Sequence, residues 1–231
     1  MIMTGFFDGN NSTIDTSTLI LAGNINGFLA RLDSIGHVKW IHTFSGPGIN
    51  GGSGLKIDAS LNIYITGSFQ DSIQLGSLKL YDTAKDFFLS KFDENGNIIW
   101  GVQANCDGNY AAGLDLIIDF DGNCCLSGYF SGNAHFGNFN LSTSNTSDMF
   151  IAKYNSNGVC LGIKNFGYAS GSSIALDNDN HIICSGEFFN TVNIGSNNFT
   201  SFGGQDIYLA KLGEIVGIEE GRLSNSELNI L

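Results

Sequence analysis

The sequence has little proline and little positive charge. Its 231 residues include 1 proline, and 10 lysines and arginines stand against 22 aspartates and glutamates, for a formal net charge of -12. Such a chain repels phosphate backbones and anionic headgroups and does not release their counterions. It also has no apolar run near the roughly 20 residues of a membrane span. Nucleic acid is therefore not an expected partner, and membrane insertion is not expected.

The chain also lacks the usual spacings of metal and catalytic residues. Its five cysteines are odd in number and contain no CxxC, so they predict neither a zinc site nor a full disulfide framework. The four histidines share no metal spacing, and there is no GxSxG motif. Residues 46–51 match GxGxxG, but a strand is expected after them, where a dinucleotide site needs a helix. We expect no enzyme, no cofactor and no catalytic residue.

What the sequence has in quantity is glycine and phenylalanine. It contains 31 glycines and 18 phenylalanines, with 42% hydrophobic and only 14% charged residues. Aromatic residues favour strands, and glycine tolerates the positive φ that tight turns demand. The composition predicts a globular, all-β fold.

A tandem repeat of about 60 residues runs along the chain. Each copy has a Gly-x-Phe element, a later strand that opens with Asp or Asn, a glycine turn and a further strand, which ends in tryptophan in the first two copies. The recurring glycines are Gly5, Gly67, Gly128 and Gly186. The aromatic positions of the later strand are Phe28, Phe88, Phe150 and Tyr208. The tryptophans are Trp40 and Trp100, and an aspartate recurs nine residues before the second, third and fourth of these glycines, as Asp58, Asp119 and Asp177.

Each repeat unit is predicted to contain four strands, exemplified by residues 114–119, 123–130, 148–154 and 159–164. The third strand is apolar on both faces, with Phe150 on one and Ile151 on the other. A sheet packed between two neighbours needs this pattern, whereas a solvated sheet has one polar face. Four-stranded units at this period predict the blades of a β-propeller.

Counting strands gives about 3.5 blades. Blade 1 is partial (3–42), blades 2 and 3 are complete (54–104 and 113–165), and blade 4 is partial (171–212), so the propeller spans 1–212 and a linker or tail spans 213–231. We expect an incomplete ring that lacks upstream blades of the same chain and exposes apolar faces at both ends. The alternative is a compact four-bladed ring with two three-stranded blades.

Two stretches resemble known families. The Asp-x-aromatic-Leu-Ala-Lys strand, the Asp-x-x-Gly-Asn turns at residues 93–97 and 119–123 and the Gly-x-Phe elements resemble the SBBP-type bacterial β-propeller repeat. That resemblance implies a propeller on exported proteins without an assigned catalytic residue. Residues 214–230 resemble the junction before a sorting domain of the type IX secretion system. Together these resemblances imply a location outside the cell or on its surface.

Two sets of polar residues are candidate sites. The candidates for calcium are Asp119, Asp121, Asn123, Asp177 and Asp179, because Ca²⁺ takes carboxylate and carbonyl oxygens. The favoured interpretation is turn chemistry, in which Asp and Asn accept backbone N–H groups. The basic residues Arg31, Lys91, Lys153 and Lys211 recur on the third strand. They indicate either an anion-binding ring or, as the favoured interpretation, ion pairs between blades with the recurring aspartates or apolar packing of the side-chain stems.

The expected function is a binding or scaffolding module for an unidentified protein or glycan. Exposed tyrosine, phenylalanine and asparagine suit sugar stacking and hydrogen bonding. The alternative is a hydrolase or lyase whose site is formed by loops at the mouth of the propeller channel. Two or more carboxylates and a histidine that converge there would favour the enzyme.

Overall fold

The computed structural model describes residues 1–231 except 11, 108–109, 195–196, 214, 216 and 221–231. The described residues form strands and contain no helix, so the all-β prediction is confirmed. It follows that none of them belongs to a helix able to span a membrane. The strands form several antiparallel sheets, and no sheet closes on itself among the described residues.

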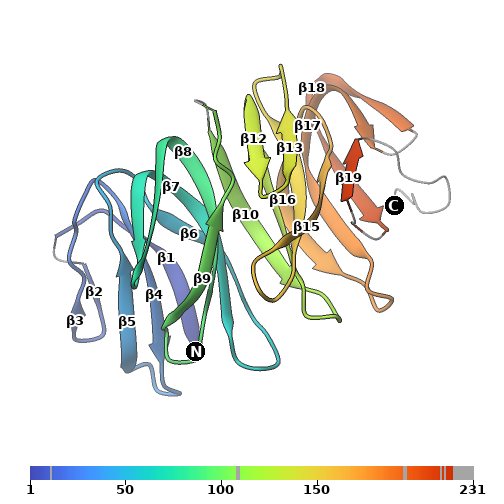
Figure 1. Ribbon diagram of the computed structural model, residues 1–231. Coiled ribbons are helices and arrows are strands. Elements are labelled where there is room, and N and C mark those ends of the chain that lie inside the picture. Colours follow the sequence, from blue (N-terminus) through green and yellow to red (C-terminus); the bar gives the residue numbers. More distant parts are fainter. Residues whose placement is uncertain (11, 108–109, 195–196, 214, 216, 221–231) are drawn as a thin grey trace.

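Four main sheets follow one another along the chain, from blue to orange in Figure 1. The first sheet contains β1 (Ile2–Phe7), β4 (Asn26–Leu32) and β5 (Val38–Phe44). The second contains β6 (Gly51–Ile57), β7 (Ile63–Leu75), β8 (Leu78–Phe92) and β9 (Ile98–Gln103). The third contains β10 (Ala111–Ile118), β11 (Cys124–Phe130), β14 (Asp148–Tyr154), β15 (Cys160–Asn165) and β19 (Gly217–Glu220). The fourth contains β16 (Ala169–Leu176), β17 (Ile182–Ile194) and β18 (Asn197–Leu212).

These strands lie where the repeat places them. The first sheet lacks the first strand of the unit and the fourth sheet lacks the last one, as the strand count indicates. The connection between the second and third strands of a unit folds back as a hairpin. It forms β2 (Thr13–Ile14) and β3 (Ser17–Thr18) beside the first sheet, and β12 (Asn133–Phe136) and β13 (Phe139–Ser142) beside the third. In the second and fourth sheets it extends β7, β8, β17 and β18.

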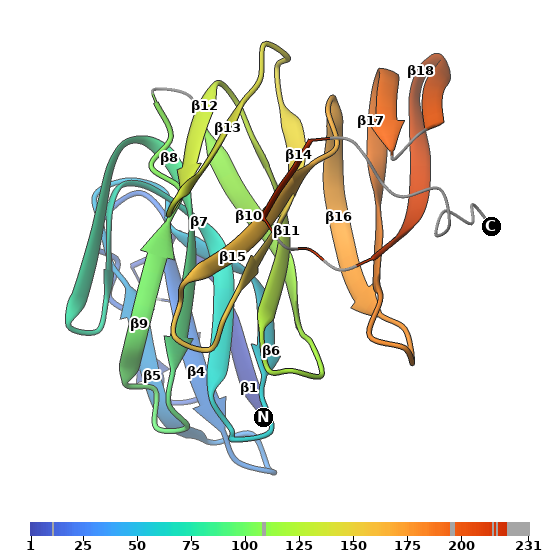
Figure 2. The ribbon, with the colours of Figure 1, turned by 45° about the vertical axis from the view of Figure 1, so that its right-hand side comes forward.

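Apolar side chains fill the space between successive sheets. One buried cluster joins the first and second sheets, another the second and third, and another the third and fourth. In β14, Phe150 belongs to the cluster facing the second sheet, and Ile151 to the cluster facing the fourth. A sheet buried on both faces explains why this strand has no polar face. Figure 2 shows the sheets side by side in this order.

The recurring glycine of the Gly-x-Phe element has a steric reason. In the register of the third sheet, Gly128 lies opposite Gly113, where the pairing of β10 with β11 is interrupted by a bulge. A Cβ atom on Gly128 would stand 2.2 Å from the carbonyl oxygen of Ala112. Gly67 and Gly186 face the same obstacle, the carbonyl oxygens of Gly51 and Ser170. No side chain fits there, so glycine recurs.

The tryptophans pack on the turn of the next sheet. Trp100, at the end of the second sheet, lies over Gly158 and donates from Nε1 to the carbonyl oxygen of Ser156 at 3.0 Å. Trp40 also packs on Gly96, together with His42, but its Nε1 has no hydrogen-bond partner among the described residues. The third copy has Gly162 at this position, and among the described residues the fourth sheet has no strand after β18 to form such a turn. The third unit therefore lacks the tryptophan, and the described part of the sheet that follows it lacks the turn on which a tryptophan would pack.

The two ends of the array differ, which corrects the expectation of exposed apolar faces at both. At the first sheet, Phe28 is only 8% exposed, because Leu19 and the segment around β2 and β3 cover its outer face. At the fourth sheet the expectation holds, since Ile207 is 84% exposed. The segment that connects β1 and β4 covers the outer face of the first sheet, and no described residue covers the outer face of the fourth.

Part of the segment expected to be a linker or tail, residues 213–231, pairs with a sheet. Residues 217–220 form β19, which pairs in parallel with β15 of the third sheet, from Gly162↔Gly217 to Asn165↔Glu220. Ile215, just before it, is buried in the cluster between the third and fourth sheets. The remaining tail residues, 214, 216 and 221–231, lie outside the described residues.

Candidate functional site

Six hairpin turns share one construction. In each, the side-chain oxygen of an Asp or Asn accepts the backbone N–H groups of the residues two and four positions later. Asp119 Oδ1, for example, accepts from Asp121 at 3.0 Å and from Asn123 at 2.7 Å. The other five begin at Asp33, Asp58, Asp93, Asn155 and Asp177. The acidic residues singled out by the repeat therefore build turns.

Three of these aspartates also hold the recurring lysine of the third strand. The Nζ–Oδ2 distances are 3.8 Å for Lys91 and Asp58, 3.0 Å for Lys153 and Asp119, and 2.6 Å for Lys211 and Asp177. Each pair lies within one sheet and does not bridge two sheets. The first sheet lacks the strand that would supply such an aspartate, and there Arg31 reaches Glu94 of the second sheet. Each basic residue of the proposed ring thus faces a carboxylate.

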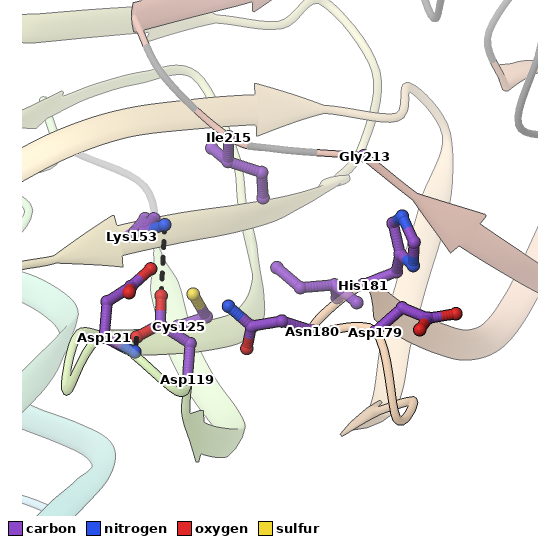
Figure 3. Close-up of a pocket in the computed structure, with 10 residues that line it drawn as sticks. Asp119, Asp121, Cys125, Lys153, Asp179, Asn180, His181, Gly213 and Ile215 are labelled. Atoms are coloured by element: carbon purple, nitrogen blue, oxygen red, sulfur yellow. Dashed lines mark hydrogen bonds and ion pairs between the residues drawn. The ribbon is translucent and has the colours of Figure 1, made fainter.

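A cavity of about 390 Å³ opens between the turns of the third and fourth sheets. We call it the turn cavity. Figure 3 shows its lining side chains converging from β10–β11, β14, β16–β17 and the segment after β18. Its polar lining consists of Asp119, Asp121, Lys153, Asp179, Asn180 and His181, and its apolar lining includes Cys125, Ile182 and Ile215. It is a polar recess at a junction between two repeat units.

A hydrogen bond fixes the two walls of the turn cavity to each other. Asn180 Oδ1, on the fourth sheet, accepts the backbone N–H of Phe120 on the third at 2.9 Å. Asn180 adopts a φ of 67°, a region that asparagine tolerates better than most residues. Asp121 and Asp179 occupy the same position of their respective turns, two residues after the turn aspartate. The repeat therefore places equivalent carboxylates on the two walls.

Histidine 181 sits beside the turn aspartate of the fourth sheet. Its Nδ1 is 3.2 Å from each carboxylate oxygen of Asp177. Lys211, followed by the backbone N–H groups of His181 and Asp179, holds the pKa of the Asp177 carboxyl well below its usual range. Burial raises the pKa of the Cys125 thiol to about 12, so this cysteine stays protonated near neutral pH. It cannot act as a thiolate nucleophile in the cavity.

The structure brings together part of the calcium candidate set. Asp119, Asp121 and Asp179 line the turn cavity, while the Asn123 amide donates to Asp119 Oδ2 at 3.1 Å. Asp177, Asp179 and His181 have ligand atoms within 4.8 Å of one another. However, Asp119 and Asp177 each already accept two backbone N–H groups and a lysine ammonium. In each case the lysine supplies the positive charge that a bound cation would otherwise provide.

Sequence reasoning missed three residues of this cavity: Lys153 as a wall residue, Asn180 as the cross-link and His181 beside Asp177. The internal repeat could have indicated these residues, because residues 119–123 and 177–181 are equivalent turns of successive units. Turns at the same position of neighbouring sheets come to lie next to each other. Comparing them in pairs would have indicated that Asp121 and Asp179 face one recess.

The other sequence candidates have structural roles. Residues 46–51 lie between β5 and β6, and the next element is a strand. A Cβ on Gly46 would stand 1.9 Å from the carbonyl oxygen of Ser72, which explains that glycine by close backbone packing. All five cysteines are free thiols, and four of them are buried.

Comparisons with known proteins leave the family open. No protein-family model matches the chain, and no curated protein does. Among solved structures, one described as a protein of unknown function from Bacteroides caccae is similar at 10% sequence identity and a TM-score of 0.43. The match covers 88% of this chain and 67% of that one. A similarity at this level carries no argument about function.

Proposed function

We propose that the chain forms SBBP-type β-propeller blades that work outside the cell or on its surface as a binding module for a glycan. The propeller is supported by four successive sheets with apolar packing on both faces of the inner ones. The location is supported by the resemblance of the repeat to those of exported proteins and of residues 214–230 to a type IX junction.

The turn cavity is the observation that carries the ligand class. Its walls present the carboxylates of Asp121 and Asp179, the amide of Asn180 and the imidazole of His181. Carboxylate oxygens accept hydrogen bonds from hydroxyl groups, and an amide both donates and accepts. A sugar offers several adjacent hydroxyl groups that can satisfy such a set at once. A scaffold for another protein would use a wider and more apolar surface than this recess.

A glycan array followed by titration calorimetry tests the proposal. We expect Asp179→Asn and Asp121→Asn to weaken binding of a captured glycan at least tenfold, because a hydrogen bond to a charged group contributes about 1.5–3 kcal/mol. The matched control is Asn95→Asp, a change between the same two residue types at the same turn position, outside the cavity. Equal affinity of all three variants and the native chain would contradict the proposal.

A hydrolase or lyase is the second candidate, and one observation favours it. The Asp177, Asp179 and His181 ligand atoms lie within 4.8 Å of one another, and Asp177 orients the imidazole. Such a histidine can act as a general base toward a bound water or a substrate proton. The test is turnover of the captured glycan. If this candidate is right, His181→Gln abolishes turnover and keeps binding. Absence of turnover by the native chain would contradict the enzyme and favour the binding module.

A further inference from the structure

The outward face of the fourth sheet has no cover among the described residues. Ile207 and Leu209, on β18, are 84% and 37% exposed. The equivalent residues of the third sheet are Met149 and Ile151, and both are fully buried. Phe87 and Leu89 of the second sheet are also fully buried. The same two positions are therefore interior in two units and exposed in the last.

The following repeat unit covers these positions where they are buried. Phe87 of the second sheet stacks on Phe136 of the β12–β13 hairpin, with ring centroids 5.4 Å apart. Met149 of the third sheet contacts Gly171 and the hydroxyl of Tyr208 on the fourth. The cover thus consists of the next sheet together with the hairpin that connects its second and third strands.

At the other end of the array, the first sheet presents the complementary half of this interface. The segment with β2 and β3 is its connection between second and third strands, and this segment lies against the outer face of the sheet through Leu19. Ile20, the next residue, is 76% exposed. Ile20 therefore belongs to the element that, in the third unit, meets the preceding sheet.

A polar contact also repeats at two of the three internal junctions. Arg31 donates to the carbonyl oxygen of Glu94 at 2.7 Å, and Lys91 donates to that of Ser156 at 3.4 Å, each reaching the last hairpin turn of the next sheet. Lys211 is the equivalent basic residue of the fourth sheet. Ser34 is the equivalent acceptor in the turn of the first sheet. The two ends of the chain carry both halves of this contact.

We propose that the outward face of the fourth sheet binds the first sheet of a second copy of this chain, head to tail, with Ile207 packed against the segment that carries Ile20. The contact continues the interface that already joins the sheets within one chain. Because it joins two different surfaces, it forms a closed ring or an open array of copies. This inference does not depend on glycan binding.

Light scattering coupled to size-exclusion chromatography, over a wide range of protein concentration, tests the proposal on the full chain. We expect the native chain to reach at least twice its monomer mass. Both Ile207→Glu and Ile20→Glu should return it to one copy, because each buries a charge in the apolar contact. Tyr81→Glu, at an exposed aromatic residue of the second sheet, is the matched control and should leave the mass unchanged.

Charge reversal separates head-to-tail assembly from other arrangements. Mixing the I207E chain with the I20K chain should restore assembly, because the two substituted residues then form an ion pair at one junction. Circular dichroism and thermal melting confirm that each variant is folded. A native chain with the mass of one copy at all concentrations overturns the proposal. So does an assembly that survives Ile20→Glu, since a face-to-face dimer would not need that residue, or a mixture that stays dissociated.

Discussion

At the scale of single residues, Asp86 is an ionisable side chain buried away from water. Asp86 lies within β8 and is fully buried, and its carboxylate accepts the backbone N–H groups of Phe87 and Asn105. Burial, followed by the charge of Asp82, raises the pKa of Asp86 from 3.8 to about 7. The first repeat has Asn26 at the same position, and its amide makes comparable contacts without a charge. The repeat therefore accepts either residue there.

Asp86→Asn should change how stability depends on pH. The folded chain keeps the Asp86 proton up to about pH 7, whereas the unfolded chain loses it near pH 4. Between these values the folded state binds more protons, so the free energy of unfolding falls as pH rises, by on the order of 2–4 kcal/mol from this group. Urea unfolding at a series of pH values should show a flatter profile for Asp86→Asn. The aspartates whose pKa values are lowered change the free energy of unfolding only below about pH 4, outside this range. Parallel profiles of variant and native chain would contradict the assignment.

Leu61→Gly should stabilise the protein. Leu61 adopts a φ of 65° in the turn between β6 and β7, where the third sheet has Gly122 at 80°. A left-handed conformation costs a non-glycine residue about 1–2 kcal/mol, part of which is offset by the entropy that glycine loses on folding. We expect the free energy of unfolding to rise by about 0.5–1 kcal/mol in urea titrations. Gly122→Ala is the converse control and should lower it, because an added Cβ meets no atom within 4 Å and only the strain remains.

At the scale of elements, the contact between a tryptophan and the next turn glycine ties neighbouring sheets together. Gly158 has a φ of 80°, and a Cβ there would stand 2.9 Å from the Trp100 ring. Gly158→Ala therefore combines backbone strain with overpacking and should cost about 2–4 kcal/mol, more than Gly122→Ala.

A double-mutant cycle separates the two costs of Gly158→Ala. With Trp100 already replaced by alanine, the ring is gone, and Gly158→Ala should cost no more than Gly122→Ala does. Chemical denaturation of the four chains measures the coupling. An undiminished cost in the Trp100→Ala chain would show that the indole ring does not constrain this turn.

For the whole molecule, the arrangement of sheets in a row predicts unequal local stability. In arrays where each unit contacts only its neighbours, stability is a sum of unit and interface terms. The second and third sheets are covered on both faces, whereas the outward face of the fourth is exposed at Ile207 and Leu209.

Hydrogen exchange of the monomeric chain should therefore be faster in one region. Peptides from residues 182–192 and 206–212 should exchange before the equivalent peptides of the second and third sheets, because local opening there exposes less additional apolar surface. The exchange is measured on the I207E chain, because this substitution is expected to keep the protein monomeric. Uniform exchange across all sheets would indicate that the array unfolds as one cooperative unit and would contradict this prediction.

The sequence by itself determined the strands, the repeat and the turns, because these depend on neighbours along the chain. Gly-x-Phe elements, alternating apolar strands and Asp turns located β10, β11, β14 and β15 closely, and the strand count correctly left the first and fourth sheets with three repeat strands each. The recurring lysines do pair with the recurring aspartates, but each pair lies within one sheet and not between two blades as the sequence analysis expects.

Only the tertiary structure decided which turns meet and which faces stay open. The turn cavity exists because the turns of the third and fourth sheets lie side by side, and Asn180 joins them with a hydrogen bond to Phe120. Residues 217–220 pair with β15 although nothing in their composition indicates a partner strand. A connecting segment caps the first sheet, and no residue that the structure describes caps the outward face of the fourth. Such contacts join residues far apart in sequence, and a local pattern does not encode them.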